Sequence, residues 1–418
     1  MGQTPIRYRA LLTGLVLVIL FCAFTPYNNV KLQNSSPAGG HFPLASFGCL
    51  LLLLVVINPL IALWKKEWRF HLHELLLVWS MVTVATGIAY TGLMRTFIIN
   101  ITTPKWFTTT AGNLGEILVP LAPPSLFPQD PKMLADLYSG MEGGLDMSWW
   151  EILLRIPWAA WMVPLFWWGL FILLLYMAML GMVGLFSHQW IENEKMNFPL
   201  LRVLETMGEA FEEGGLWKFF TQNHFILGFS IPVVLHLFNG LHTYFPEVPQ
   251  IPTLILAQPY IPKEGLLSGF YKAKIYIYPA FIGFAFLASK QVSFSFWCFF
   301  ILGGLLPGVL QFAGWRLPAA ALGTTFSPVL SRVEEMQMMG AFAIFFFFIV
   351  WLARDHLRLV LQSIFRKQPL ANDFRGLLDP RTAFFLFVGG ILGMTVWLCF
   401  IGMDLVPTLL FLGVCFMV

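Results

Sequence analysis

The segment at 188–207 holds the chain's most suggestive group of ionisable side chains, directly after a long apolar run. If the helix continues through this segment, Glu192 lies one turn after His188, and Lys195 lies on the following turn. Glu194 supplies a second carboxylate in the same stretch. Such a group could gate an opening at the cytoplasmic surface or exchange protons. The alternative is a solvated face in which the carboxylates pair with neighbouring cations and serve only a structural role.

A helix break is predicted at Phe198 and Pro199, because proline lacks a backbone N–H and restricts the residue before it. A second, amphipathic helix is expected at 200–213, within a cytoplasmic connection at 188–222. The cytoplasmic gate that we predict consists of His188, Glu192, Glu194, Phe198 and Pro199.

A second group of polar side chains lies near the end of an apolar run at 225–245. Ionisable residues inside such runs are costly to bury, so they often mark a solute or proton pathway. His236 and His242 are six residues apart and do not share a face of a regular helix, whereas Asn239 is one turn from each. A helix broken at Asn239 and Gly240 would form a polar exterior mouth. A packed or interfacial role for the two histidines is the alternative.

Two isolated cations complete the predicted pathway. Arg95 follows the third apolar run, where its planar guanidinium could attract a carboxylate or anchor the helix among lipid headgroups. Lys290 separates a short apolar segment, 275–289, from a longer one, 291–315. It lies either at a cytoplasmic turn between two crossing segments or deep at the tip of a re-entrant hairpin. The predicted pathway residues are Arg95, His236, Asn239, His242 and Lys290.

Enzyme chemistry receives little support from the sequence. His71 and Glu74 are three residues apart and could share a helical face, but His73 would then point elsewhere, unlike a two-turn metal motif. No phosphate-binding glycine motif or nucleophile elbow is present. We therefore predict no catalytic residue, no metal and no cofactor, and a membrane-embedded metal enzyme is the third of our alternatives.

The elements that must position these residues are membrane helices. The chain of 418 residues is 58% hydrophobic and only 11% charged, far more apolar than soluble domains of this length. A bilayer core of about 30 Å requires about 20 helical residues. We predict an all-α, polytopic transmembrane bundle forming one integral domain over 1–418. Its apolar segments are expected at 10–30, 42–64, 75–94, 156–187, 225–245, 275–289, 291–315, 336–353, 382–403 and 405–418.

The basic residues predict the orientation of this bundle, because positively charged flanks stay on the cytoplasmic side. Arg7 and Arg9 precede the first run, Lys65 and Lys66 follow the second, and a basic loop at 354–381 precedes the ninth. All three lie in the cytoplasm if the N-terminus does. The acidic, proline-rich loop at 95–151 then faces the exterior. The net charge of +3 belongs to these loops, so we expect no nucleic-acid partner.

Several motifs accompany the helix end at 188–213, namely Asn239-Gly-Leu-His242, Tyr278-Pro279, Gly283, Ser293-Phe-Ser-Phe-Trp297 and Gly303-Gly304. Their order, over most of the chain, resembles an uncharacterised prokaryotic family of multi-spanning membrane proteins. More distantly, Phe198-Pro199 and the stretch at 283–304 look like parts of the oligopeptide transporter superfamily. That resemblance implies proton-driven movement of peptides or metal chelates.

The resembling proteins continue beyond Val418, whereas this chain ends within its tenth apolar run. We therefore expect a shortened or split version, or a last helix completed by another chain. The predicted function is that of a secondary transporter for a small organic solute in a prokaryotic cytoplasmic membrane. Its predicted partners are the lipid bilayer, the solute and, in one arrangement, further copies of the chain. The main alternative is a non-catalytic membrane subunit that assembles partner proteins.

Overall fold

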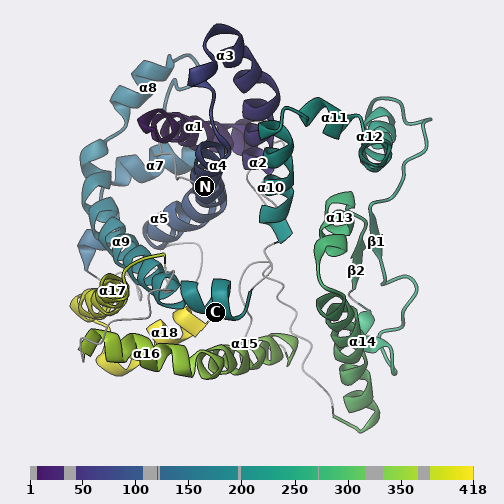
Figure 1. The fold of residues 1–418 in the computed structure, drawn as a ribbon. Helices are drawn as coiled ribbons and strands as arrows, with labels where there is room; N and C mark the ends of the chain where they lie inside the picture. The colour runs from purple at the N-terminus through teal and green to yellow at the C-terminus, as the bar shows by residue number, and fades with distance from the viewer. Residues whose placement is uncertain are drawn as a thin grey trace. The chain divides into compact units, whose positions relative to one another are not determined.

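The structure is a computed structural model that describes residues 7–32, 44–106, 120, 123–195, 199–271, 273–315, 333–365 and 377–417. Helices dominate the described chain, so the predicted all-α class is confirmed (Figure 1). The chain divides into two compact units, of which the first comprises Met1–Met196 and Phe348–Val418 and the second comprises Asn197–Phe347.

The first unit begins with three apolar helical segments that are each continued by π-helical turns. Its elements before the division are α1 (Tyr8–Pro26), η1 (Tyr27–Lys31), α2 (Leu44–Leu52), η2 (Leu53–Ile57), α3 (Asn58–Trp64), η3 (Lys66–Trp68), α4 (Leu72–Gly87), η4 (Ile88–Ile98), α5 (Ile99–Trp106), η5 (Pro124–Leu126), α7 (Pro131–Ser139), α8 (Trp149–Arg155), α9 (Trp158–His188) and η6 (Gln189–Asn193). Its later elements are α16 (Arg354–Phe365), α17 (Pro380–Phe400) and α18 (Leu405–Met417).

The second unit combines helices with one small antiparallel hairpin. Its elements are α10 (Pro199–Glu212), α11 (Leu216–Phe220), α12 (Asn223–Tyr244), β1 (Leu254–Leu256), η7 (Ser268–Phe270), β2 (Lys274–Tyr276), α13 (Pro279–Leu287) and α14 (Lys290–Phe312). The boundary between the units falls within α15 (Val333–Leu352). In the hairpin, Ile255 is paired with Ile275, a register that the sequence analysis did not foresee.

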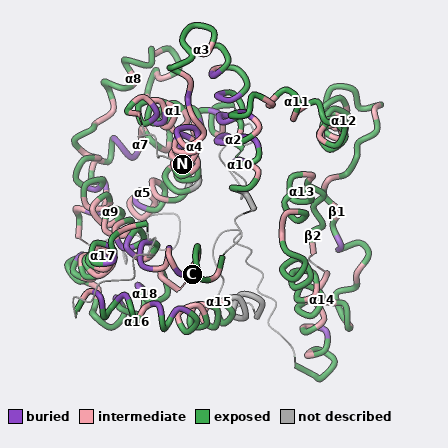
Figure 2. Tube along the Cα trace, in the orientation of Figure 1, coloured by how far each residue is buried: buried purple, intermediate pink, exposed green. Residues whose placement is uncertain are grey.

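Seven described helical stretches are long and apolar enough to cross a membrane. They are Tyr8–Lys31, Leu44–Trp64, Leu72–Trp106, Trp158–Asn193, Asn223–Tyr244, Lys290–Phe312 and Pro380–Phe400. Two shorter apolar helices, Gly340–Leu352 and Leu405–Met417, lie where further segments were predicted. Figure 2 shows α12 and α14 mostly exposed, which suits helices whose apolar side chains face lipid.

Two predicted segments differ from the structure. The third run was expected to end at 94, but its helix continues through η4 and α5 to Trp106, so Arg95 lies within it. Helix formation depends on backbone hydrogen bonds, and the polar residues after 94 do not interrupt them. The short segment 275–289 contains a strand and the nine-residue helix α13, which reaches only about 14 Å and cannot cross a bilayer core alone.

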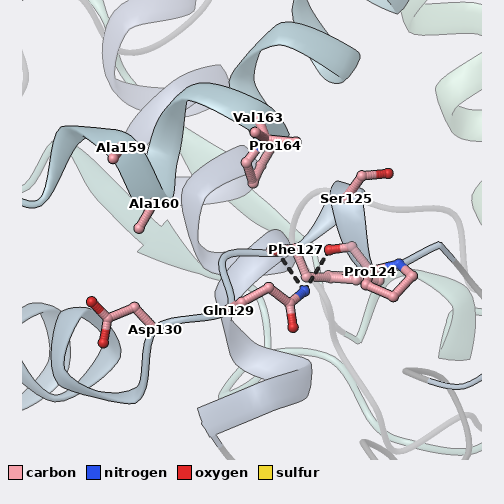
Figure 3. A pocket seen from close by; sticks show the side chains of 9 residues that line it. All are labelled: Pro124, Ser125, Phe127, Gln129, Asp130, Ala159, Ala160, Val163 and Pro164. Carbon is pink, nitrogen blue, oxygen red and sulfur yellow. Dashed lines mark hydrogen bonds between the residues drawn. The ribbon is translucent and has the colours of Figure 1, made fainter.

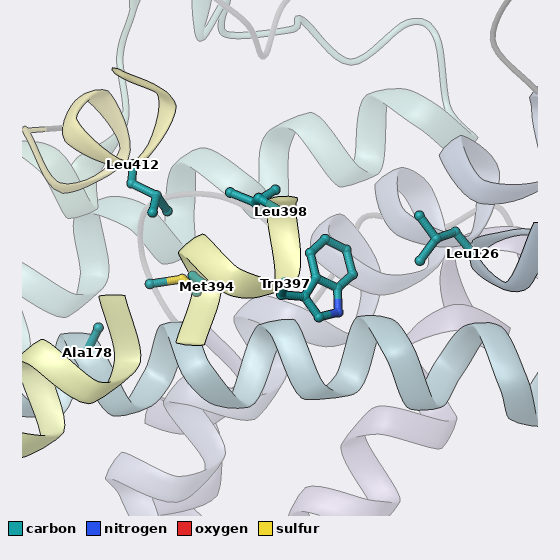
Figure 4. Packing of buried hydrophobic residues seen from close by; sticks show 6 residues of the cluster. All are labelled: Leu126, Ala178, Met394, Trp397, Leu398 and Leu412. Carbon is teal, nitrogen blue, oxygen red and sulfur yellow. The ribbon is translucent and has the colours of Figure 1, made fainter. Parts of the chain in front are cut away.

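The first unit is held together by an antiparallel contact between α9 and α17. Gly181 and Gly390 allow this approach, because a Cβ atom on Gly390 would lie 2.7 Å from both Ala178 N and Leu174 O. Farther along, the Trp397 indole donates to the Trp167 carbonyl at 3.1 Å. Figure 4 shows the apolar cluster at this contact, with members Leu126, Ala178, Met394, Trp397, Leu398 and Leu412. Small residues at such crossings are typical of membrane helices, where close packing replaces the hydrophobic effect.

A buried carboxylate joins the beginnings of α1 and α4. Glu74 has no exposed side-chain surface, and Arg7 binds its two oxygens through Nε and Nη2, both at 2.8 Å. Arg9 donates to the same carboxylate at 3.2 Å, and the backbone N–H of His71 donates at 2.9 Å. Since Gly14 on α1 also packs against Met81 on α4, the two helices run parallel from this cluster.

Gly181→Ala is expected to lower the thermal stability of the purified protein. The added methyl group would collide with the backbone of α17 at Ala383 O and Phe387 N, and overpacking of this kind costs about 1–3 kcal/mol. Gly169→Ala is the matched control, because a Cβ at Gly169, also on α9, meets open space. Its unfolding midpoint in the same detergent should stay unchanged or rise. Equal losses in the two variants would contradict the assigned contact.

Glu74→Gln should destabilise the first unit strongly, because it keeps the side-chain shape but leaves two guanidinium groups without their anion. Breaking a buried ion pair costs about 3–5 kcal/mol, and the partial exposure of Arg7 and Arg9 reduces that figure. The control Asp355→Asn removes the exposed pairs with Arg354 and Arg358 and should cost about 0–1 kcal/mol. Unfolding midpoints of the two variants measure the difference, and similar midpoints would argue against a special role for Glu74.

Candidate functional site

The predicted gate lies at the end of α9, where the helix loosens into the π-helical turn η6 and stops at Asn193. Gln189 links the last helical turn to the residues that follow it. Its side-chain amide donates to Glu194 Oε1 at 2.9 Å, and its side-chain oxygen accepts from the Asn193 amide at 2.6 Å. Lys195 has a positive φ of 48°, so the chain turns there. The break therefore comes earlier than predicted, because an L residue in this left-handed conformation cannot continue the helix.

The members of the predicted gate have different surroundings. The Glu194 carboxylate folds back onto Gln189, whereas Glu192 is exposed. Phe198 and the side chain of Pro199 lie outside the described residues. α10 begins at Pro199, one residue before the predicted start at 200, and it has a buried face that consists of Leu204, Met207 and Phe211.

A histidine that the sequence analysis missed, His356, lies beside the predicted gate. The rings of His188 and His356 stack with centroids 5.6 Å apart, and His356 Nε2 lies 2.9 Å from the Leu185 carbonyl oxygen. Because a carbonyl only accepts, Nε2 must carry the hydrogen. His356, Val360 and Ser363 form the buried face of α16, a spacing of four and three residues that the sequence displays.

Hydrogen bonds tie the predicted basic loop to the same helix end. Ser187 Oγ accepts from Leu377 N at 3.0 Å and donates to the Gly184 carbonyl at 3.0 Å. The His356 contact holds α16 beside the last turn of α9, and the Ser187 bond to Leu377 holds the start of α17 there. Both described ends of the basic loop therefore lie beside this turn. The positive segment and the predicted gate therefore lie at one end of the first unit.

Burial is the main influence on the titration of His356, whose residue is only 7% exposed. Burial lowers the pKa of His356 from its ordinary value, the hydrogen bond to Leu185 opposes this change, and the nearby His188 lowers the pKa further. The neutral imidazole is thus favoured in the folded protein. Protonation would occur at Nδ1 and would put a positive charge between α16 and α9.

A shallow pocket of about 460 Å³ lies at the opposite end of α9 (Figure 3). Its wall combines the beginning of α9 with the described part of the predicted exterior loop. Gln129 shapes this wall, since its amide donates to the carbonyls of Phe127 and Pro124 and its oxygen accepts from Lys105. The lining residues are Pro124, Ser125, Phe127, Gln129, Asp130, Ala159, Ala160, Val163 and Pro164. The apolar floor and the single carboxylate at its edge give the pocket little capacity for acid–base chemistry.

Asn239 and His242 hold the loop that follows α12. The Asn239 amide donates to the Ile251 carbonyl at 3.0 Å and accepts from the Ile251 N–H at 2.9 Å. His242 Nδ1 lies 2.6 Å from the Val248 carbonyl oxygen. α12 runs unbroken through Asn239 and Gly240, so the helix break considered there is not present. Neither side chain needs a solute to explain its position.

The remaining pathway residues lie on three separate helical elements. His236 is exposed on α12, and Lys290 is exposed in the first turn of α14, after the Ser289 cap. Arg95 lies within η4, and its side chain is outside the described part of the structure. Their joint role in a pathway stays a prediction, as does the membrane depth of Lys290.

The alternative metal cluster has a different geometry from the one expected. α4 begins at Leu72, so His71 precedes the helix, and its ring stacks on His73 with centroids 5.8 Å apart. The expectation that His73 points elsewhere is therefore wrong. Both oxygens of Glu74 bind Arg7, so the carboxylate already has its cationic partners.

A protein-family model described as "Family of unknown function (DUF6785)" matches residues 1–418. The chain belongs to the DUF6785 family. No curated protein and no solved structure matches it. Membership of DUF6785 confirms the predicted uncharacterised family, while the likeness to oligopeptide transporters stays a prediction.

For this DUF6785 member, stability is expected to fall as the solution is acidified. A histidine with a lowered folded-state pKa contributes stability that is present above its unfolded value of about 6.5 and is lost as pH falls through the folded value. His356→Asn should therefore reduce the drop in unfolding midpoint between pH 7.5 and 5. His224→Asn, an exposed histidine on α12, should leave the drop unchanged. An identical pH profile in wild type and His356→Asn would contradict the assignment.

Proposed function

We propose that this chain is a multi-spanning membrane carrier for a small organic solute of the peptide or chelate class, driven by protons. The observation that carries the proposal is the position of Arg95. This arginine lies within an apolar helical stretch, Leu72–Trp106, eleven residues before its end, or about 16 Å along a regular helix. Leu72 lies 23 residues, or about 35 Å of regular helix, before Arg95, so this arginine falls near the far end of the membrane-crossing length, where its guanidinium can attract an anionic solute.

The backbone around Arg95 supports the proposal. Ile88–Ile98 is π-helical over eleven residues, whereas π-helices usually appear as single-turn bulges and often at functional sites. A widened helix leaves some carbonyls without their regular partners, and these can bind a solute or an ion. An arginine in this segment would add a planar charged donor suited to a carboxylate.

The predicted gate at the end of α9 supplies the second part of the proposal. Its helix also ends in a π-helical turn, and it carries a stacked histidine pair together with Glu192 and Glu194. Imidazole and carboxylate side chains at this helix end could exchange protons with the cytoplasm. In this scheme the solute is attracted at Arg95, and the far end of α9 responds to protons as access alternates between the two sides.

The proposed orientation has the N-terminus in the cytoplasm. Arg7 and Arg9 bind backbone carbonyls at Glu67, Trp68 and Arg69, so the basic residues before α1 and after α3 share one side. The antiparallel pairing of α9 with α17 is compatible with a basic segment 354–381 on that same side. Positive flanks then favour the cytoplasmic face of a prokaryotic membrane.

Uptake into proteoliposomes tests the carrier. Purified protein should accumulate at least one member of a panel of labelled di- and tripeptides and metal chelates when an inward proton gradient is imposed, and an ionophore should abolish this uptake. Arg95→Gln should reduce the rate about tenfold or more, as expected when a charge-assisted hydrogen bond is lost. Arg95→Lys should retain part of the rate.

Arg155→Gln is the matched control, because Arg155 is an exposed arginine on α8 whose guanidinium binds only the neighbouring loop. Its uptake should equal that of wild type. The carrier proposal would be contradicted if the folded wild-type protein transported no member of the panel. If that protein also co-purified in fixed ratio with another membrane protein, the result would favour the alternative of an assembly subunit.

A further inference from the structure

The corner between α3 and α4, defined as residues 63–69, presents an unusual set of exposed side chains. Leu63 is 80% exposed, Trp64 is 93% exposed and Trp68 is 61% exposed. Lys65 and Lys66 stand exposed between the two tryptophans. Because Trp64 ends one span-length helix and Leu72 begins the next, this corner must lie at a membrane boundary if both helices cross. Tryptophan and lysine are the residues that membrane boundaries favour.

The corner is fixed from its inner side by hydrogen bonds to its backbone. Arg7 donates to the carbonyls of Glu67 at 2.8 Å and Arg69 at 2.9 Å, and Arg9 donates to the Trp68 carbonyl. Beyond the corner, Asn58 forms a paired contact with the backbone of Phe70, at 2.8 and 3.0 Å. Since these bonds engage carbonyl groups, the side chains of Lys65, Lys66 and Trp68 are free to face outward.

The charges of the corner leave a positive surplus. Lys65 Nζ lies 5.4 Å from the centre of the Trp68 ring, and neither Lys65 nor Lys66 pairs with a carboxylate among the described residues. Glu67 is exposed directly after Lys66 and offsets one charge. Beneath the corner, two guanidinium groups share the single carboxylate of Glu74, so another positive charge remains.

We propose that the 63–69 corner is a docking site for the headgroup of an anionic phospholipid. Trp64, Trp68 and Leu63 insert at the level where headgroups meet acyl chains, and the ammonium groups of Lys65 and Lys66 bind the lipid phosphate and its additional negative charge. A zwitterionic lipid offers the same apolar contacts without the net charge, so the corner prefers the anionic lipid. This inference depends on membrane insertion alone and not on the proposed transport.

Native mass spectrometry of the detergent-purified protein with equimolar phosphatidylglycerol and phosphatidylcholine tests the site. Wild type should retain phosphatidylglycerol preferentially. The double variant Lys65→Gln/Lys66→Gln should lose this preference by about fivefold for each ammonium group removed, and Lys65→Arg/Lys66→Arg should keep it. The control Lys132→Gln/Lys263→Gln removes the same charge from two exposed positions, one in the predicted exterior loop at 95–151 and one in the loop between β1 and β2, and should behave as wild type.

Thermal midpoints with added ligand separate a lipid site from a simple phosphate site. Phosphatidylglycerol should raise the midpoint of wild type and of the control, and it should raise that of the Lys65→Gln/Lys66→Gln variant less. Inorganic phosphate at the same concentration should have no effect. The proposal is overturned if the Gln variant, with an unchanged midpoint before lipid is added, still prefers phosphatidylglycerol as wild type does. It is equally overturned if the control loses the preference to the same extent, or if phosphate stabilises as well as lipid.

Discussion

The Glu74 carboxylate is the constraint on which the described start of the first unit depends. A negative charge with no exposed surface persists only where cations and donors replace its water, and Arg7, Arg9 and the His71 N–H do so here. The same two arginines also bind the backbone that joins α3 to α4. One ionic cluster thus sets the start of α1, the start of α4 and the path of the chain between α3 and α4.

The size of the side chains, more than their polarity, determines how the helices of this protein pack. In lipid, apolar side chains gain little by meeting each other, so contacts depend on how closely backbones approach. Gly14 on α1 and the glycines of the α9–α17 contact provide that approach, whereas α12 and α14 keep their large apolar side chains exposed. Several of the polar contacts described lie at helix ends or bind loops, as at Asn239, Ser187 and His356.

The sequence revealed the membrane class and most apolar segments because hydrophobicity over about 20 residues is a strong local signal. It also located the break before α10 to within a few residues, through Pro199. Segment ends were harder, since Arg95 appeared to close a helix that backbone hydrogen bonding continues to Trp106. Contacts between residues far apart in the sequence could not be predicted. The residues around Glu74 do not indicate that Arg7 is its partner, and His356 is 171 residues from Leu185.

The order of the units along the chain has a consequence for biosynthesis. The second unit interrupts the first, so Trp167 and Trp397, which share a hydrogen bond, are separated by 230 residues. A ribosome adding about 5–20 residues per second needs roughly 10 to 45 seconds to bridge that interval. During this time α9 would lie in the bilayer with its glycine face uncovered, because α17 has not yet been synthesised. In a membrane, lipid would cover the glycine face of α9 until α17 is made.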